Sequence, residues 1–242
     1  MGQMVGILVQ VLMAAFIAGV IVLAIRTVKR GKREDERIRT EWAAFEAGAP
    51  ARGWTYERRA RGRATEYCGV GPMPSKGSNL TAWHYTTGEF RGRSFTCFEY
   101  RYHNPLSGGA GIDESRKLTF ESVFLVSTPG SGTPFMQVGR PSKLDRVTGR
   151  GPRTLLGVPG FDEKFRVDSH DETFVRNVLT DDVRAFLLSD PRGEKNPLRV
   201  RDDQLFTWYT GTLSPQEIED RLNYLCDVLD RIPETVWAPA SA

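Results

Sequence analysis

Cysteine is scarce in this sequence. Three cysteines occur among 242 residues, and none of them form a Cys-x-x-Cys pair. Such pairs are typical of zinc ribbons, and small secreted domains carry many more cysteines, so neither a zinc ribbon nor a disulfide framework is indicated. The 24 glycines and 14 prolines follow no fixed period, which excludes collagen-like and solenoid folds. The sequence also lacks a nucleotide-binding loop, a zinc-protease helix motif and a nucleophile elbow.

Composition and length favour a folded globular protein. The sequence is 40% hydrophobic and 26% charged, which is ordinary for globular chains and excludes a wholly disordered one. A length of 242 residues allows one large domain or two small ones.

The N-terminal stretch differs from the rest of the chain. Residues 4–25 carry no charge, and Gln10 is the only clearly polar side chain among them. As a helix this run would be about 33 Å long, enough to cross a hydrocarbon core of ~30 Å. Buried core helices are usually shorter and keep a polar face. We therefore predict that residues 4–25 span a lipid bilayer.

Basic residues follow this run directly, and they set the predicted orientation. A cleaved secretory signal would instead carry positive charge before the apolar run and a small-residue cleavage site after it. Because lysine and arginine favour the cytoplasmic side, we expect the N-terminus outside and the C-terminal part in the cytoplasm, at the cell membrane. A cleaved signal or the inverted topology is the alternative. The cluster, which could also contact anionic lipid, consists of Arg26, Lys29, Arg30, Lys32 and Arg33.

The charge of the remaining chain argues against a nucleic-acid partner. The formal net charge is +3, and the basic cluster contributes five positive charges, so the remainder carries −2. Later basic stretches lack the interleaved aromatic residues of a single-strand binder, so we interpret them as solvated faces or membrane-facing loops. The first of these stretches contains Arg52, Arg58, Arg59, Arg61 and Arg63.

Hydrophobic periodicity and composition divide the chain after residue 33 into further predicted segments. Residues 34–50 predict a juxtamembrane amphipathic helix, because Ile38, Trp42 and Phe45 form one stripe. Residues 51–78 are rich in arginine, glycine and proline and predict an irregular linker. Residues 79–233 predict a cytoplasmic α+β domain, and residues 234–242 a tail. Residues 1–33 form the anchor with its basic flank.

Strand signals dominate the first half of the predicted domain. Aromatic and threonine-rich runs at 79–87 and 94–102 predict a hairpin, and residues 118–127 alternate cleanly between two faces. Shorter strands are predicted at 135–138 and 161–167. Residues 198–200 and 205–209 predict a second hairpin.

Helix signals gather in the last third. Helices are predicted over 169–179, with Ser169 as a candidate N-cap, and from Thr180 onward. The final helix is predicted with Ser214 as N-cap, Pro215 at its first position and Glu217 completing a capping box. Its apolar stripe comprises Ile218, Leu222, Leu225, Leu229 and Ile232. Strand hairpins followed by helices predict an α+β fold: an N-terminal transmembrane helix, then an antiparallel sheet covered by C-terminal helices.

Four segments of the chain resemble a bacterial domain family. They are FRGRSFTCFEY at 90–100, FDEKFRVDSHD at 161–171, VLTDDV at 178–183 and LFTWY at 205–209. Together with the arginine-rich, lysine-poor composition, they are similar to a domain family of unknown function found in membrane-associated proteins of actinobacterial type. The resemblance covers residues 79–232. It implies a membrane association and no catalytic residues.

Candidate chemical groups are few and scattered. Cys68, His84, Cys97 and His103 lack the close ligand spacing of a zinc site, so we predict no metal and no cofactor. Cys226 lies beside the stripe of the last helix and is interpreted as a core thiol.

One titratable cluster is dense in sequence. His170 lies among Asp168, Asp171 and Glu172. An acid–base pair is one interpretation, and acidic capping of a helix N-terminus is the other, which we favour. The Asn79-Leu-Thr pattern is a glycosylation sequon, which a cytoplasmic location would leave unused.

These observations favour a protein- or ligand-binding module on a single-pass anchor, without identified catalytic residues. The alternative is a membrane-tethered enzyme of hydrolase type with an unrecognised site. A pocket gathering His84, His103 or His170 with a carboxylate would favour the enzyme. An aromatic surface patch involving Trp83, Phe98 or Trp208 would instead favour a protein partner.

Overall fold

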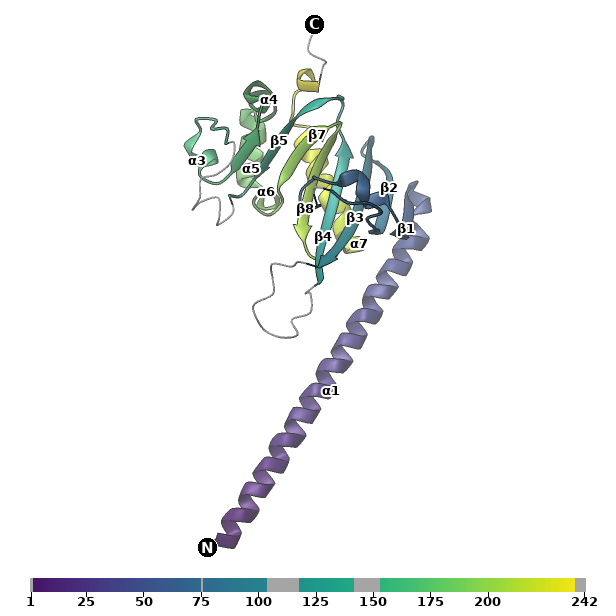
Figure 1. Cartoon of the computed structure of the whole chain (residues 1–242), viewed down its shortest axis with the longest axis vertical. Coiled ribbons are helices and arrows are strands. Elements are labelled where there is room, and N and C mark those ends of the chain that lie inside the picture. The colour runs from purple at the N-terminus through teal and green to yellow at the C-terminus, as the bar shows by residue number, and fades with distance from the viewer. Residues whose placement is uncertain (1, 75, 104–117, 142–152, 238–242) are drawn as a thin grey trace. The chain divides into compact units, whose positions relative to one another are not determined.

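The computed structural model describes the backbone of residues 2–74, 76–103, 118–141 and 153–237. Side chains are described over the same ranges, except residues 2–18, 21–22 and 103. The chain divides into two compact units, Met1–Gly48 and Ala49–Ala242. The first unit is a helix, and the second contains the sheet (Figure 1).

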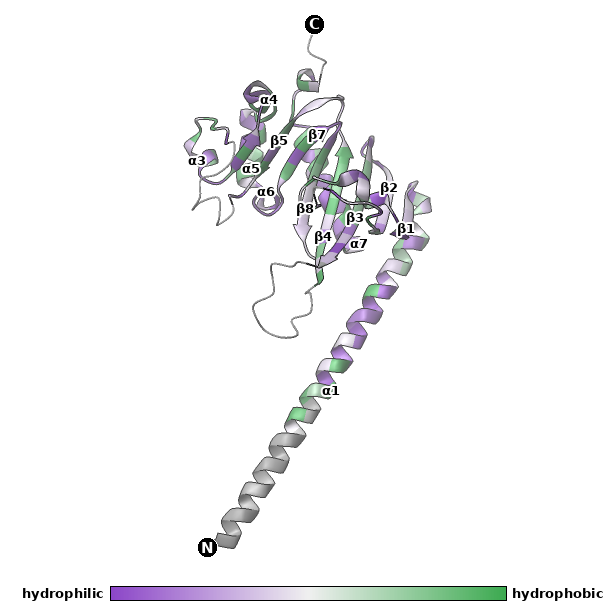
Figure 2. Ribbon diagram, viewed as in Figure 1, coloured by the Kyte–Doolittle hydropathy of each residue, from purple (hydrophilic) through white to green (hydrophobic). Residues whose placement is uncertain are grey.

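The N-terminal unit is one continuous helix, α1 (Gly2–Gly48), which includes both helical segments predicted from the sequence. It ends at Gly48, shortly before Pro50, as expected. Its described charged part is hydrophilic in Figure 2, and Arg37 pairs with Glu34 and Glu41 along one side. These i,i+3 and i,i+4 pairs support the helix locally.

The described side chains do not test whether residues 4–25 span a membrane. Within that part of the chain, no helix is both long enough and apolar enough to traverse a bilayer. Most side chains of the predicted span, residues 4–25, lie outside the described residues. The span therefore stays a prediction.

The described strands form one eight-stranded antiparallel sheet in the order β1-β2-β3-β4-β8-β7-β5-β6 (Figure 1). This confirms the antiparallel α+β part of the prediction. The strands are β1 (Thr55–Ala60), β2 (Ala82–Phe90), β3 (Arg93–His103), β4 (Leu118–Ser127), β5 (Thr133–Gly139), β6 (Arg166–Ser169), β7 (Leu198–Asp202) and β8 (Gln204–Thr210).

The described helices of the second unit are short, apart from α7. They are η1 (Pro50–Arg52), η2 (Arg63–Tyr67), α3 (Pro159–Asp162), α4 (Glu172–Val178), α5 (Asp181–Ser189), α6 (Pro191–Lys195), α7 (Pro215–Leu229) and η4 (Glu234–Trp237). Helix α7 packs against β4 and β8, so the predicted covering of the sheet by a C-terminal helix is confirmed.

Both faces of the central strands are buried. In β4, Val123 and Leu125 belong to a core cluster with Tyr67 and Val70, which come from residues 61–80. Neighbouring strand residues point to opposite faces, so Phe124 lies on the other side of the sheet. The segment 61–80 therefore covers one face of the central sheet and α7 covers the other.

Three predicted segments differ in the structure. The predicted tail, residues 234–242, contains η4, in which Trp237 is buried. The expected linker, residues 51–78, contains β1 and η2 and belongs to the second compact unit. Strand β1 was missed because it is an edge strand whose side chains are mostly exposed, so no apolar alternation marks it. The strand expected over 161–167 begins instead as α3, where Phe161 and Phe165 stack at 4.9 Å. Their spacing of four fits a helical turn as well as a strand.

The last helix follows the prediction closely, with one exception. Its stripe is buried throughout, from Ile218 to Ile232. Ser214 is the N-cap residue and Pro215 the first helical residue, but the capping box does not form. The Ser214 hydroxyl donates to Gln216 Oε1, and the Glu217 carboxylate accepts a hydrogen bond from the Tyr209 hydroxyl at 2.5 Å. Glu217 therefore links α7 to β8 instead of closing the helix end.

Candidate functional site

The structure does not bring the predicted cysteine and histidine candidates together. Cys97 is buried in β3, Cys226 is buried in α7, and Cys68 is half-buried after η2. His84 lies in β2, while the side chain of His103 is outside the described residues. Within the described part of the chain, no three His, Cys, Asp or Glu side chains are placed to hold a metal ion.

The acidic cluster around His170 has a structural role. Asp171 is the N-cap of α4, and its carboxylate accepts a hydrogen bond from the backbone N–H of Phe174 at 2.8 Å. Asp168 and Glu172 each pair with a nearby arginine, and His170 is exposed. The capping interpretation is confirmed, although the cap is Asp171 and not Ser169.

The aromatic residues proposed for a partner surface separate in the structure. Phe98 is fully buried in the core cluster, while Trp83 and Trp208 are half-buried. Trp208 packs against the covering segment, where a Cβ on Gly71 would come within 2.7 Å of its ring. Trp83 instead belongs to a second group of side chains on β1, β2 and β3.

The backbone of β2 is irregular at Trp83. Pairing between β2 and β3 shifts by one residue between Trp83 and Thr86, which marks a β-bulge. His84 in this bulge has a φ of 52°, a left-handed conformation that costs free energy for any residue other than glycine. Its imidazole Nδ1 is hydrogen-bonded to the Tyr56 hydroxyl at 2.8 Å. Bulges of this kind re-aim side chains and occur often beside functional sites.

Two arginines stack on the ring of Trp83. The guanidinium carbon of Arg59 lies 5.0 Å from the ring centroid, and that of Arg101 lies 4.1 Å from it. The Glu99 carboxylate, 2% exposed, accepts a hydrogen bond from Arg101 Nε at 2.5 Å and another from the backbone N–H of Leu213 at 2.9 Å. The direction of Arg101 is therefore fixed on two sides, by the ring and by a buried carboxylate.

Positive charges lie close to His84 in the bulge. Burial, followed by the positive charges of Arg101 and Arg58, lowers the pKa of His84 to about 4. Its imidazole is therefore neutral at physiological pH. We call this group the bulge surface; it consists of Tyr56, Arg58, Arg59, Trp83, His84 and Arg101.

The chemistry of the bulge surface is that of binding. Guanidinium groups held on an aromatic face bind anions, and they offer planar pairs of N–H donors to carboxylate or phosphate oxygens. The neutral imidazole of His84 adds a polar group without a charge. The carboxylate nearest to the stack, Glu99, is committed to Arg101 and Leu213.

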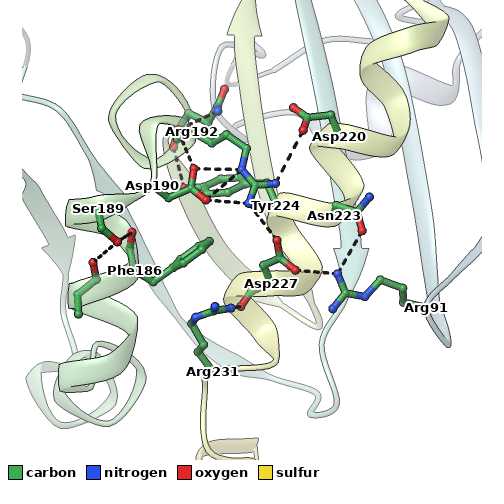
Figure 3. Close-up of polar contacts among 12 residues, drawn as sticks. Arg91, Phe186, Ser189, Asp190, Arg192, Asp220, Asn223, Tyr224, Asp227 and Arg231 are labelled. Carbon is green, nitrogen blue, oxygen red and sulfur yellow. Dashed lines mark hydrogen bonds and ion pairs between the residues drawn. The ribbon is translucent and has the colours of Figure 1, made fainter.

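A second charged cluster fastens α7 to its neighbours (Figure 3). Asp227 accepts hydrogen bonds from Arg91 at 2.7 Å and from Arg192 at 3.0 Å. Burial opposes ionisation of Asp227, but these two hydrogen bonds outweigh it and lower its pKa. We call this cluster the α7 clamp; it consists of Arg91, Arg93, Asp190, Arg192, Asp227 and Asp230.

The α7 clamp is balanced in charge and structural in role. Its three arginines face its three aspartates, and Asp220 lies 3.8 Å from Arg192, so the cluster has no excess positive charge. The ion pairs join α7 to α6 and to the turn between β2 and β3. Because each arginine already has a carboxylate partner, the cluster is poorly suited to binding an external anion.

One buried carboxylate lies apart from both clusters. Glu121 accepts a hydrogen bond from Thr210 at 3.1 Å through Oε1, and its Oε2 has no partner among the described residues. Burial raises the pKa of Glu121. Glu99 is the register partner of Ser122, the neighbour of Glu121, so the two carboxylates face opposite sides of the sheet. They cannot act as a general acid–base pair on one substrate.

Sequence reasoning named four members of the bulge surface, Arg58, Arg59, Trp83 and His84, without joining them, and it missed Tyr56 and Arg101. Arg58 and Arg59 were assigned to solvated faces, and His84 and Trp83 were considered separately. One sequence feature could have pointed to this surface, because an arginine-rich segment precedes the predicted strand that contains Trp83 and His84. The bulge that joins them depends on the register of β2 against β3, which a single sequence does not encode locally.

Comparisons with known proteins support the fold. No protein-family model and no curated protein matches the sequence. Among solved structures, the chain is similar to the mycobacterial trehalose monomycolate transport factor A, TtfA, with a TM-score of 0.54 at 14% sequence identity. The match covers 81% of this chain and 96% of that one. At this identity the likeness concerns the fold.

Proposed function

We propose that this protein is a membrane-tethered binding module that takes part in transport and not in catalysis. In this proposal residues 4–25 form the anchor, and the basic cluster from Arg26 to Arg33 lies at the cytoplasmic surface, in contact with anionic lipid. The folded unit, Ala49–Ala242, then lies in the cytoplasm and carries the binding surface.

The composition of the bulge surface is the observation that carries the binding role. It combines cations, aromatic rings and a neutral imidazole, and the buried carboxylate beside it is occupied by structural bonds. Such a surface can hold a ligand or a partner, but it supplies no activated nucleophile. The likeness in fold to a trehalose monomycolate transport factor adds support for a transport role.

The anchor is tested by fractionation of host cells that produce the full chain. We expect the chain to stay in the membrane fraction through alkaline carbonate washing, because a spanning helix is held by the hydrophobic effect. We also expect protease added outside intact cells to leave the folded unit uncut. Release by carbonate, or cleavage of the folded unit from outside, would contradict the proposed tether or its orientation.

The binding role is tested by site-specific photocrosslinking in the same cells. A photoreactive residue at Arg59 reports on the bulge surface, and one at Asp181, a highly exposed residue of α5, is the matched control. We expect crosslinked products from position 59 and few from position 181. Equal crosslinking at both positions, or ester hydrolysis by the purified full chain that is lost in a His84→Asn variant, would favour another function.

A further inference from the structure

We propose that the bulge surface binds a phosphate group, carried either by a lipid headgroup or by a small soluble ligand. This inference rests on the proposed function in one respect, since it names the chemistry that the binding module recognises. It does not require that residues 4–25 span a membrane.

The charges of the surface match a phosphate monoester. Arg58, Arg59 and Arg101 contribute three positive charges, and Glu99 removes one, which leaves a local charge of +2. A phosphate monoester carries about −1.5 to −2 at neutral pH. Among the described residues, the ion pairs include neither Arg58 nor Arg59, so both charges remain available to a ligand.

Among the described residues, Arg101 donates a hydrogen bond only through Nε and Arg59 donates none, so the terminal N–H groups of both remain available. A guanidinium group lying over an aromatic ring uses its π face for the ring, and its N–H groups point outward in its own plane. Arg101 donates its Nε–H to Glu99, so the N–H groups of its two terminal nitrogens are the donors that remain for a ligand. Because Trp83 holds both groups within 5.0 Å of its centroid, little side-chain entropy remains to be lost when an anion binds.

The β-bulge gives an independent reason to expect a ligand here. His84 keeps a left-handed backbone conformation at a position where regular pairing would avoid the strain. The bulge places its imidazole against Tyr56, near Arg58 and Arg101. A bound anion would offset these positive charges, which makes the pKa of His84 a local reporter of occupancy.

The test uses the full chain in an uncharged detergent, titrated with inorganic phosphate and followed by the imidazole NMR signals. We expect saturable binding and a rise in the pKa of His84 of about one unit. The Arg58→Gln, Arg59→Gln double variant should bind at least about tenfold more weakly, since each charge-assisted contact is worth that much. Arg59→Lys, which keeps the charge and loses the planar fork, should weaken binding by a smaller factor.

Arg61→Gln is the matched control, because Arg61 is an exposed arginine just beyond β1 and outside the bulge surface. It should bind phosphate within about twofold of the unchanged chain, because an exposed charge that makes no direct contact with the ligand adds only a weak, screened attraction. Equal weakening by Arg61→Gln would show general charge attraction and overturn the proposal. An unchanged affinity in the double variant, or no change in the His84 pKa, would also overturn it.

The source of the phosphate is decided by a competition experiment. The detergent-solubilised chain is presented with vesicles of phosphatidylcholine alone or with added phosphatidic acid, with and without inorganic phosphate. Binding to phosphatidic acid that depends on Arg58 and Arg59 identifies a lipid headgroup. If the chain binds inorganic phosphate but does not bind vesicles that contain phosphatidic acid, the ligand is a soluble phosphate. A chain that binds phosphate but is released from membranes by carbonate refutes the tether alone.

Discussion

Replacing Glu99 with glutamine should destabilise the folded unit strongly, although the two side chains have nearly the same shape. Glu99 accepts two hydrogen bonds, from Arg101 Nε at 2.5 Å and from the backbone N–H of Leu213 at 2.9 Å, and it is almost completely buried. A glutamine amide retains one acceptor oxygen and turns two N–H donors toward the second donor. One buried donor is therefore left unsatisfied, and the charge that compensates Arg101 is lost.

The cost can be estimated from these contacts. A hydrogen bond to a charged group is worth about 1.5–3 kcal/mol, and an orphaned buried donor costs about 1–3 kcal/mol. Because Arg101 is 28% exposed and can recover hydration, we expect a loss of about 2–4 kcal/mol in the free energy of unfolding. For a unit of this size that corresponds to a fall in Tm of about 5–15 °C.

The assay is thermal unfolding of the full chain followed by near-UV circular dichroism. Glu57→Gln is the matched control, because Glu57 is an exposed glutamate on β1. It should change the free energy of unfolding by less than about 0.5 kcal/mol. If Glu99→Gln melts within the error of Glu57→Gln, the buried carboxylate does not hold Arg101 and the loop before α7 as we infer.

Three further outcomes are expected. Gly71→Ala should destabilise the fold by about 2 kcal/mol in urea unfolding, since Gly71 has a φ of 54° and an added Cβ would press on the Trp208 ring; an unchanged midpoint would contradict this. Because the pKa of Asp227 is lowered, its stabilisation is complete above its ordinary value of 3.8 and disappears as the pH falls through the lower folded-state value, so Asp227→Asn should flatten the acid limb of a stability–pH curve. Thiol titration of the folded chain should modify Cys68 well before the two buried cysteines, since burial raises the pKa of Cys97 to about 12; simultaneous modification would contradict the burial.

Sequence patterns predicted secondary structure correctly where neighbouring residues determine it. The hairpin of β2 and β3 follows from two aromatic-rich runs around Arg91-Gly92, whose positive φ values suit a two-residue turn. Helix α7 follows from Pro215 and from an apolar period that matches one buried face. Each of these depends on residues within a few positions of one another.

Sequence patterns predicted the wrong secondary structure where contacts between distant parts of the chain determine it. Strand β1 is exposed and arginine-rich, and it exists because β2 offers it a pairing edge. Phe161 and Phe165 suit a strand and a helical turn equally, and the carboxylate of Asp162, which accepts the N–H groups of Gly157 and Val158, selects the turn.

The sequence alone determined the chain class: an uncharged N-terminal run with a basic flank, then an antiparallel α+β unit with an amphipathic final helix that starts at Pro215. Those features come from charge, hydrophobic period and turn residues, which act over short distances. Only the tertiary structure decided that Arg59 and Arg101 meet on Trp83 beside His84. That meeting depends on a one-residue shift between β2 and β3, and register is set by the whole sheet and not by the residues that it brings together.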